Sequence, residues 1–515
     1  MKHIELFAGC GGLSLGFKDE GFELALANEL SPMAAETFAF NHLNENLTKS
    51  DDLTKTKTFW ISSQFSRKEV NKRLREEPLL QADKKYKEVE ETNAKALLGG
   101  LTIGSIVDLN KILKQKDDLV QLLSKNLDVV SGGPPCQSFS MAGMRKKDCD
   151  KNTLPWEFAK FVELTKPKIA LLENVTGILR PFTENGEKYH AWFEVAKAFV
   201  GVGYVPICLH INAKYVGAAQ NRPRFVMIAL RHDIAEAKAN TKDSSLKKAL
   251  NHGLAFYKKV NEGLKTKVTE LSFFDVETDK DFFKGNIFGP LNSKCNSLAS
   301  AKDAIGDLRG NRFNESPYVK EINSLKNEHR HTVNKLKNHE LRSNNFLVQS
   351  RFRLYQIMNT LEKKQRKELA IFLKDPESGS LSKETKNTLL KQKYLDPLGQ
   401  LTELESLKEL LSYLKNLKTK KQTQKALLPD LPAPAALSIP DDACHWDENH
   451  PRTLSVREMA RIQSFPDWFE FRSKVTTGGK MRRFEVPQYT QVGNAVPPLL
   501  GKALAKCVKS ILTLP

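Results

Sequence analysis

The residues most able to do chemistry are a cysteine and a glutamate that each follow a short apolar stretch. Cys136 lies in a Pro-Pro-Cys-Gln run after the apolar residues 127–130, and Glu173 ends a second apolar stretch 37 positions later. A parallel sheet brings the carboxyl ends of its strands to one edge, so the thiol and the carboxyl can meet over one substrate. This pair suits nucleophilic attack on an electron-poor ring, assisted by a proton donor.

The non-catalytic alternatives are that Cys136 is a buried core residue and that Glu173 is a capping residue at the surface. Free cysteine is often a small core residue, but a Pro-Pro turn at the end of a strand favours an accessible thiol. Two arginines, Arg222 and Arg224, lie at the start of another strand, and alternation puts them on one face. Their guanidiniums could orient Glu173 or meet phosphate, or they could form a surface salt-bridged pair.

Alternating apolar strands and amphipathic stretches must position these side chains. The expected strands are residues 3–7, 22–28, 101–106, 127–131, 168–173, 204–212 and 224–231. This rhythm predicts an α/β fold with a doubly wound sheet. Residues 44–99 interrupt it and are rich in Lys, Glu, Asp and Asn. We expect a helical insertion there, either a solvated decoration or an arm that contacts DNA.

The pattern changes after residue 231. Leucine and lysine recur over 361–373 and 401–417, which predicts amphipathic helices with a basic outer face. We expect a loop at 418–425 and an extended Pro-rich linker at 428–435. Order returns at about 453. An amphipathic stretch at 457–465 carries Met459, Ile462 and Phe465 on one stripe, and an apolar helix at 498–512 closes the chain.

Composition narrows the class of partner. The 515 residues contain 80 Lys and Arg against 61 Asp and Glu, a net charge of +19 with a pI near 9.4. This excess favours a polyanion, foremost nucleic acid, over the alternative of solvated lysines. Seven scattered cysteines form no metal-binding spacing and indicate reduced thiols in a cytosol-like compartment. Neither a signal peptide nor a membrane span is expected.

Seven motifs, in order along the chain, resemble those of the bacterial DNA (cytosine-5) methyltransferases. They are Phe-Ala-Gly-Cys-Gly-Gly (7–12), Asn-Glu (28–29), Gly-Gly-Pro-Pro-Cys-Gln (132–137), Glu-Asn-Val (173–175), Gln-Asn-Arg-Pro-Arg (220–224), Arg-Glu-Met-Ala-Arg-Ile-Gln-Ser-Phe-Pro (457–466) and Gln-Val-Gly-Asn-Ala-Val-Pro (491–497). Each motif alone could arise by chance, but all seven in family order could not. The resemblance spans residues 1–42, 101–231 and 450–515.

The resemblance implies an active site and a site for S-adenosylmethionine. The implied catalytic residues are Cys136, Glu173, Arg222, Arg224 and Gln220. The implied cofactor-binding residues are Phe7, Gly9, Gly11, Gly12, Glu29, Ser105, Pro134 and Asn494. Phe7 would stack on the adenine, Glu29 would bind the ribose hydroxyls, and Asn494 would lie near the methionine part. Three positions depart from the family pattern: Leu30 replaces a bulky residue, Ser105 an acidic one and Ala495 a serine.

The resemblance also implies three parts and a reaction. Residues 1–231 would form a Rossmann-like catalytic and cofactor domain with the charged insertion 44–99. A variable target-recognition region would follow at 232–450, and residues 451–515 would connect back and rejoin the catalytic domain.

The implied enzyme flips a cytosine out of duplex DNA, attacks carbon 6 through Cys136 and methylates carbon 5, without a metal. It would act as a monomer on double-stranded DNA in a bacterial cytoplasm, at the nucleoid. A restriction–modification setting would add a cognate endonuclease for the same site. An RNA cytosine-5 methyltransferase and a catalytically silent DNA-binding homologue stay open as alternatives.

Overall fold

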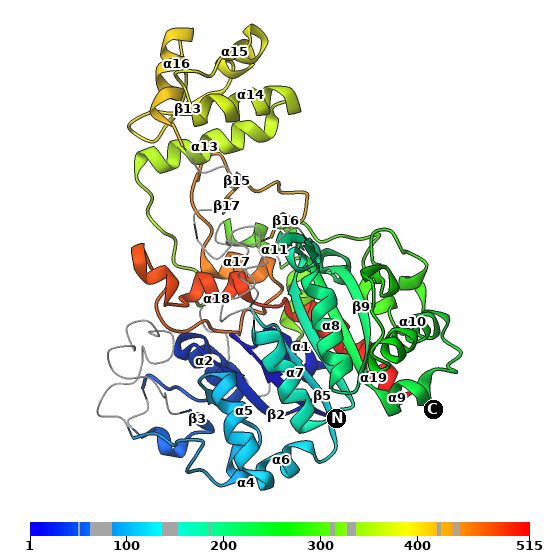
Figure 1. The fold of residues 1–515 in the computed structure, drawn as a ribbon. Helices are drawn as coiled ribbons and strands as arrows, with labels where there is room; N and C mark the ends of the chain where they lie inside the picture. The colour runs from blue at the N-terminus through cyan, green and yellow to red at the C-terminus, as the bar shows by residue number, and fades with distance from the viewer. Residues whose placement is uncertain are drawn as a thin grey trace.

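Nine strands form one sheet at the centre of the protein (Figure 1). The computed structural model describes residues 1–49, 52–61, 85–135, 153–184, 187–309, 315–326, 336–419, 424–435, 440 and 443–515. The strands are β1 (Lys2–Leu6), β2 (Glu23–Glu29), β3 (Thr58–Trp60), β4 (Gly100–Ile103), β5 (Leu127–Gly132), β6 (Ile169–Val175), β9 (Tyr204–Asn212), β11 (Pro223–Arg231) and β12 (Phe273–Asp275). All seven strands expected from the sequence are present, so the doubly wound α/β fold is confirmed.

The strand order explains where a ligand can bind. Across the sheet it runs β12-β9-β11-β6-β5-β1-β2-β4-β3, and β11 alone among these strands is antiparallel to its neighbours. From β1 the chain builds outward through β2 on one side and later through β5 and β6 on the other. The order therefore switches between β1 and β5, and a crevice opens at the carboxyl ends of strands at such a point.

Helices cover both faces of the sheet because its central strands are apolar on both sides. On one face, α5 (Ile106–Gln115), α6 (Asp117–Ser124), α7 (Leu154–Thr165) and α8 (Ala191–Gly201) share a core with Ala170 and Leu172. Figure 1 shows these helices in front of the sheet. On the other face, α1 (Gly12–Asp19) and α19 (Pro498–Thr513) share a core with Ile169 and Leu171.

The closing helix packs against the first one. The backbones of α1 and α19 cross so closely that a Cβ added to Gly16 would collide with the backbone nitrogen of Lys502. On the partner helix, a Cβ added to Gly501 would lie 3.0 Å from the carbonyl oxygen of Leu13. Glycine on both helices therefore permits the contact, and residues 498–513 become part of the N-terminal core.

The insertion at 44–99 departs from the helical expectation over its described residues. Its described helical segments are short: the 3₁₀ turn Leu53–Lys55 and α4 (Ala94–Leu97). Its strand β3 pairs in parallel with β4 at the edge of the sheet. The β-branched and aromatic side chains of Thr58, Phe59 and Trp60 favour a strand, and all three are buried. Residues 62–84 lie outside the described part.

The sheet-bearing unit continues beyond residue 231, where the sequence placed a domain boundary. Helices α9 (His232–Lys238), α10 (Ser244–Asn261), α11 (Ala301–Ile305) and α12 (Pro317–Asn323) contribute to the same core as α1 and α19. Strand β12 also joins the sheet, beside β9. Short apolar segments in this region therefore find partners on the catalytic sheet, which composition alone did not indicate.

A second core lies in a helical unit formed by residues 346–417. It contains α13 (Phe346–Thr360), α14 (Lys363–Lys374), α15 (Lys383–Leu390), α16 (Leu407–Asn416) and the hairpin of β13 (Lys393–Leu395) with β14 (Leu401–Glu403). Figure 1 shows this helical unit projecting away from the sheet. The expected helix at 361–373 is confirmed, whereas 401–417 begins as β14 and becomes helical only at Leu407.

Two short pairings connect the helical unit to the rest of the molecule. Strand β15 (Lys425–Ala426) pairs with β17 (Ala443–Cys444), and β16 (Ala433–Pro434) pairs with β10 (Gln220–Asn221). The expected linker at 428–435 thus ends in an extended segment that is anchored to the active-site strand. No helix in the described ranges is long and apolar enough to cross a membrane.

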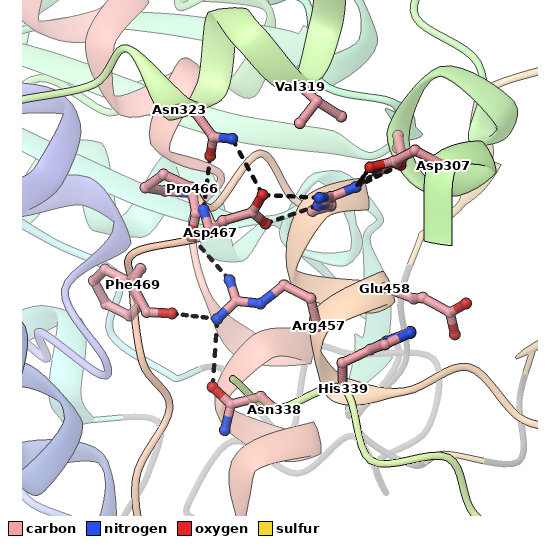
Figure 2. Close-up of polar contacts among 12 residues, drawn as sticks. Asp307, Val319, Asn323, Asn338, His339, Arg457, Glu458, Pro466, Asp467 and Phe469 are labelled. Carbon is pink, nitrogen blue, oxygen red and sulfur yellow. Dashed lines mark hydrogen bonds and ion pairs between the residues drawn. The ribbon is translucent and has the colours of Figure 1, made fainter. Parts of the chain in front are cut away.

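A buried arginine network fixes the segment that follows the helical unit. It is built on α17 (Val456–Ile462), and Figure 2 shows its polar contacts. Arg457 is 0% exposed and donates hydrogen bonds to the carbonyl oxygens of Pro466 (2.8 Å) and Phe469 (2.6 Å). Arg461 pairs with Asp467 at 2.7 Å and with Asp307 at 2.6 Å. These contacts join α17 to the core around α11 and α12.

Candidate active site

A buried ion pair stands at the carboxyl end of β6. Glu173 and Arg224 come from neighbouring antiparallel strands, and Arg224 Nε lies 2.7 Å from Glu173 Oε1. Their side chains are 12% and 11% exposed. Arg224 also donates from Nη1 to the carbonyl oxygen of Pro223 at 2.8 Å. The carboxylate is thus held in a fixed orientation at the sheet edge.

The end of β5 meets the same carboxylate. A Cβ added to Gly133 would lie 2.9 Å from Glu173 Oε2, so glycine leaves the room that the carboxylate occupies. Asn174 donates from Nδ2 to the carbonyl oxygen of Pro134 at 3.0 Å, which ties the two strand ends together. Pro135 is exposed, and Cys136 follows directly but lies outside the described residues.

Arg222 lies within the electrostatic reach of Arg224 and Glu173, but its side chain hydrogen-bonds a different part of the chain. Its Nη2 donates to the carbonyl oxygens of Gly493 at 2.8 Å and Ala495 at 3.1 Å, in the C-terminal motif. Burial lowers the pKa of Arg222 and, to a lesser extent, that of Arg224, where the Glu173 carboxylate offsets part of the effect. Arg222 lies in neither β10 nor β11, because the strand is interrupted at that residue, so strict strand alternation does not apply across it.

Gln220 is fully buried at the junction with the linker. Its strand β10 pairs with β16, and no described residue hydrogen-bonds its side-chain oxygen or nitrogen. No hydrogen bond joins this amide to Glu173 or Arg224 within the described part of the chain. The catalytic role expected for Gln220 therefore stays a prediction.

The glycine loop after β1 forms the neighbouring part of the crevice. Phe7 has a φ of 54°, Gly9 of 56° and Gly11 of 92°. A positive φ strains any residue other than glycine, and residues strained in this way, such as Phe7, are often functional. A Cβ added to Gly9 would meet no atom within 4 Å, so open space adjoins that backbone. A Cβ added to Gly12 would collide with the carbonyl oxygen of Val496. The C-terminal motif therefore packs directly on this loop.

Glu29 links the loop to the end of β2. Its Oε2 accepts a hydrogen bond from the backbone N–H of Gly9 at 2.8 Å, and its Oε1 accepts one from Ser31 at 2.8 Å. Glu29 therefore ties the backbone of the glycine loop to the end of β2. Together, the open backbone at Gly9 and the carboxylate at Glu29 fit the nucleoside part of S-adenosylmethionine.

Two other expected cofactor residues have local roles in the structure. Ser105 caps α5, because its hydroxyl accepts a hydrogen bond from the backbone N–H of Val107 at 3.2 Å. Asn494 is exposed at the last position of α18 (Gln488–Asn494), one residue before the carbonyl that Arg222 binds. Contacts of Ser105, Pro134 and Asn494 with a cofactor stay predictions.

Glu5 is a buried carboxyl group beneath the glycine loop. It accepts hydrogen bonds from the backbone N–H of Ser14 at 2.9 Å and from the Ser14 hydroxyl. Burial raises the pKa of Glu5 to about 8, against the lowering effect of both hydrogen bonds. The same strand carries His3, whose pKa burial lowers to about 3. Strand β1 thus buries two groups that favour their uncharged forms.

Sequence reasoning missed two features of the site. The Gln491 side chain donates from Nε2 to the carbonyl oxygens of Met33 (3.1 Å) and Val486 (3.0 Å) and accepts from the Thr37 hydroxyl (2.6 Å). Its place in a motif was visible, but two of its partners, Met33 and Thr37, lie more than 450 positions away.

The second missed feature is a hydrogen-bonded chain at the far side of the same edge. His210 Nδ1 lies 2.7 Å from Asp275 Oδ2, and His210 Nε2 lies 3.2 Å from the Thr176 hydroxyl. Asp275 belongs to the three-residue strand β12, which carries no periodic signal in the sequence. In the described ranges, no group of three or more His, Cys, Asp or Glu could hold a metal ion.

Comparisons with known proteins agree with this architecture. The model of the family "C-5 cytosine-specific DNA methylase" matches residues 1–67 and 81–510. The type II methyltransferase M.DdeI of Desulfomicrobium norvegicum is 25% identical over 98% of this chain and 88% of its own length. M1.HphI of Haemophilus parahaemolyticus is 24% identical over 100% and 88%, and M.AgeI of Thalassovita gelatinovora is 26% identical over 99% and 99%.

These matches span nearly the whole chain, including the strands that carry Glu173, Arg224 and Glu29. The resemblance inferred from the motifs is therefore confirmed. The chain belongs to the C-5 cytosine-specific DNA methylases and is a DNA cytosine-5 methyltransferase.

Proposed function

We propose that this enzyme methylates a cytosine that it has flipped out of duplex DNA, with Cys136 as the nucleophile. The buried pair of Glu173 and Arg224 supports this proposal most directly. It presents a carboxyl group in a fixed position beside the strand end that leads into Cys136. A base inside a duplex cannot reach a sheet edge, so it must leave the stack at a cost of a few kcal/mol.

The chemistry follows from the residues at the edge. The Cys136 thiolate adds to carbon 6 of the cytosine, and the electron pair displaced from the ring double bond makes carbon 5 nucleophilic. Glu173, in its protonated form, hydrogen-bonds ring nitrogen 3 and relieves the negative charge that develops there. Arg224 orients Glu173 and can bind the base oxygen. Loss of the carbon-5 proton and of the thiolate then restores the aromatic ring.

S-adenosylmethionine, the methyl donor of the family, supplies the transferred methyl group. We propose that Phe7 and the backbone of Gly9, Gly11 and Gly12 receive its nucleoside part, with Glu29 accepting hydrogen bonds from the ribose hydroxyls. Ser105, Pro134 and Asn494 complete the pocket. The positive φ and open surroundings of Gly9 support this assignment.

The basic helical unit and its flanking segments would read the DNA. A net charge of +19 supports double-stranded DNA as the partner, and the target-recognition region would lie within 232–450. By analogy with the type II methyltransferases that it resembles, we propose a bacterial restriction–modification setting, with a cognate endonuclease for the same sequence. The enzyme would act as a monomer in the cytoplasm, at the nucleoid.

Trapping on modified DNA tests the proposal. A duplex that contains 5-fluorocytosine cannot lose the group at carbon 5, so a working enzyme should stay covalently bound in a denaturing gel. We expect an adduct with wild-type protein and none with Cys136→Ser, although the variant should still bind cofactor. Trapping on RNA alone would favour an RNA methyltransferase, and absence of any adduct would indicate a silent homologue. Sequencing of host DNA for 5-methylcytosine would identify the site.

A further inference from the structure

We propose that Arg222 is a positioning residue that couples the cofactor pocket to the base pocket through the end of α18. This inference rests on the proposed function and adds to it a role that the motif alone did not indicate. The Arg222 side chain contacts neither Glu173 nor the open space at Gly9 through any hydrogen bond between described residues. Its hydrogen bonds instead connect the end of α18, beside the proposed cofactor pocket, to the strand that leads to Arg224 in the proposed base pocket.

Arg222 binds the C-terminal end of a helix. The carbonyl groups in the last turn of any helix lack intrahelical partners, and the negative end of the helix dipole favours a cation there. Arg222 Nη2 donates to two such carbonyls, those of Gly493 and Ala495, and the residue is 2% exposed. Because water is excluded, solvent and salt screen this interaction little. Arg222 therefore helps to fix where α18 ends.

The end of α18 determines the position of the glycine loop. Val496, the next residue after Ala495, places its carbonyl oxygen against Gly12, with no room for a Cβ between them. Gln491, within α18, holds the backbone of Met33 beside the end of β2. A displacement of residues 493–496 would therefore move the loop that is proposed to receive the cofactor.

The other side of Arg222 is equally constrained. Its backbone N–H donates to Asn212 Oδ1 at 2.9 Å, and Asn212 Nδ2 donates in turn to Asn221 Oδ1 at 2.8 Å. Two residues later, Arg224 holds Glu173. A short, rigid stretch of backbone therefore connects the carboxyl group of the base pocket to the helix end of the cofactor pocket.

The first test measures cofactor binding without DNA or catalysis. Lysine keeps the charge of Arg222 but lacks the planar fork of donors. In calorimetric titrations with S-adenosylhomocysteine, Arg222→Lys should bind about tenfold more weakly, which corresponds to about 1.4 kcal/mol. The matched control, Arg224→Lys, should bind within about threefold of wild type but lose methyl transfer. In steady state, Arg222→Lys should raise the KM for cofactor more than it lowers kcat.

Normal S-adenosylhomocysteine affinity of a folded Arg222→Lys protein would overturn the proposal. If the variant does not fold, hydrogen exchange on wild-type protein decides. Because coupling is reciprocal, duplex DNA alone should slow exchange at 491–497, and S-adenosylhomocysteine alone should slow it at 220–224. If each ligand slowed exchange only in the segment that it contacts directly, the coupling would be contradicted.

The two proposals fail in different ways. A wild-type protein that forms no adduct with 5-fluorocytosine would overturn the proposed function. An active wild type with an unperturbed Arg222→Lys cofactor affinity would overturn only the coupling.

Discussion

Arg224 and Glu173 form a buried ion pair between antiparallel strands, with Arg224 Nε 2.7 Å from Glu173 Oε1. In this arrangement one carboxylate oxygen is occupied by the guanidinium. The other, Oε2, faces Gly133, where a side chain would intrude. The close approach of Oε2 explains why a glycine directly follows β5.

Replacement of Glu173 by glutamine should slow methyl transfer by about two to four orders of magnitude, the usual contribution of an acid–base group. The amide can still hydrogen-bond the base but cannot deliver a proton, so duplex affinity should change little. Single-turnover transfer from labelled cofactor, measured beside duplex binding, separates the two effects. Weak duplex binding with a normal rate in the bound complex would make Glu173 a binding group instead.

The crossing of α1 and α19 allows a stability test with a matched control. Gly16 and Gly201 both lie in helices, and alanine is intrinsically favoured over glycine in a helix by about 1 kcal/mol. A Cβ at Gly16 would collide with the backbone of Lys502, whereas one at Gly201 would meet no atom within 4 Å. Gly16→Ala should therefore lower the free energy of unfolding by about 1–3 kcal/mol.

Gly201→Ala should be neutral or slightly stabilising in the same urea titrations. Equal effects of the two substitutions would show that α19 does not pack on α1 at this crossing.

The pH dependence of stability follows from two residues of β1. Burial raises the pKa of Glu5 from its ordinary 4.5 to about 8 and lowers the pKa of His3 from 6.5 to about 3. Between pH 6.5 and 8, the unfolded chain has released the Glu5 proton while the folded chain keeps it. Stability therefore falls as pH rises through this window. Between pH 4.5 and 6.5, His3 acts in the opposite direction and the two contributions cancel.

Glu5→Gln should remove the Glu5 contribution, because a glutamine oxygen can accept the hydrogen bonds from Ser14 without ionising. The stability of wild type relative to the variant should decrease by up to about 2 kcal/mol from pH 6.5 to 8, since each pKa unit corresponds to about 1.4 kcal/mol. Urea unfolding at four pH values in this window measures the difference. A constant difference would show that Glu5 titrates alike in the folded and unfolded chains.

The central strands and the place of Glu173 at a strand end could be predicted from sequence because both have local signals. The mainly apolar residues 127–130 and 169–172 mark the positions of β5 and β6, and Glu173 directly follows the second of these stretches. The partners of Arg222 and Gln491 could not be predicted, because they depend on how segments hundreds of positions apart meet. β3 and β12 were missed because three residues are too few to show a period.

The expected boundary at residue 231 illustrates a different limit. Composition changes there, but α10 and β12 still bury apolar side chains against β9 and its neighbours. The change in charge pattern therefore reflects the exposed surface of these elements. The extent of the domain depends instead on which apolar side chains share its core. The separate core begins only with α13.

The helical unit should contribute much of the non-specific affinity for DNA. Lys363, Lys364 and Lys367 are exposed on α14, while Lys420 and Lys421, which the sequence also singled out, lie outside the described residues. Each phosphate contact contributes about −0.9 to the slope of log affinity against log salt. Replacing the three lysines by glutamine should flatten that slope by about 2.7 if all three contact phosphate.

A matched triple replacement in and beside α10, at Lys242, Lys247 and Lys258, should leave the slope unchanged, because α10 packs beside β9 on the sheet-bearing unit. Equal slopes for the two triple variants would show that the α14 lysines are solvated surface residues that do not contact phosphate.

Arg457 should be essential for the stability of the segment between the helical unit and the sheet. Besides Pro466 and Phe469, it donates from Nε to the carbonyl oxygen of Lys337 at 3.0 Å (Figure 2 shows the first two contacts). Burial lowers its pKa to about 10, well within the charged range at neutral pH. Methionine at this position would keep the apolar stem but remove the donor to the buried carbonyl groups of Phe469 and Pro466 and to the partly buried one of Lys337. The Pro466 carbonyl would keep its bond from the backbone N–H of Phe469.

Hydrogen bonds to a charged group contribute about 1.5–3 kcal/mol each, so Arg457→Met, which loses several of them, should lower the free energy of unfolding by about 3 kcal/mol or more. The control is Arg231→Lys, whose partly exposed pair with Asp233 should contribute less than about 1 kcal/mol. Urea unfolding followed by tryptophan fluorescence measures both, and Trp468 lies within the affected segment. Similar losses of stability for the two variants would show that the hydrogen bonds of the Arg457 guanidinium do not stabilise the segment between the helical unit and the sheet.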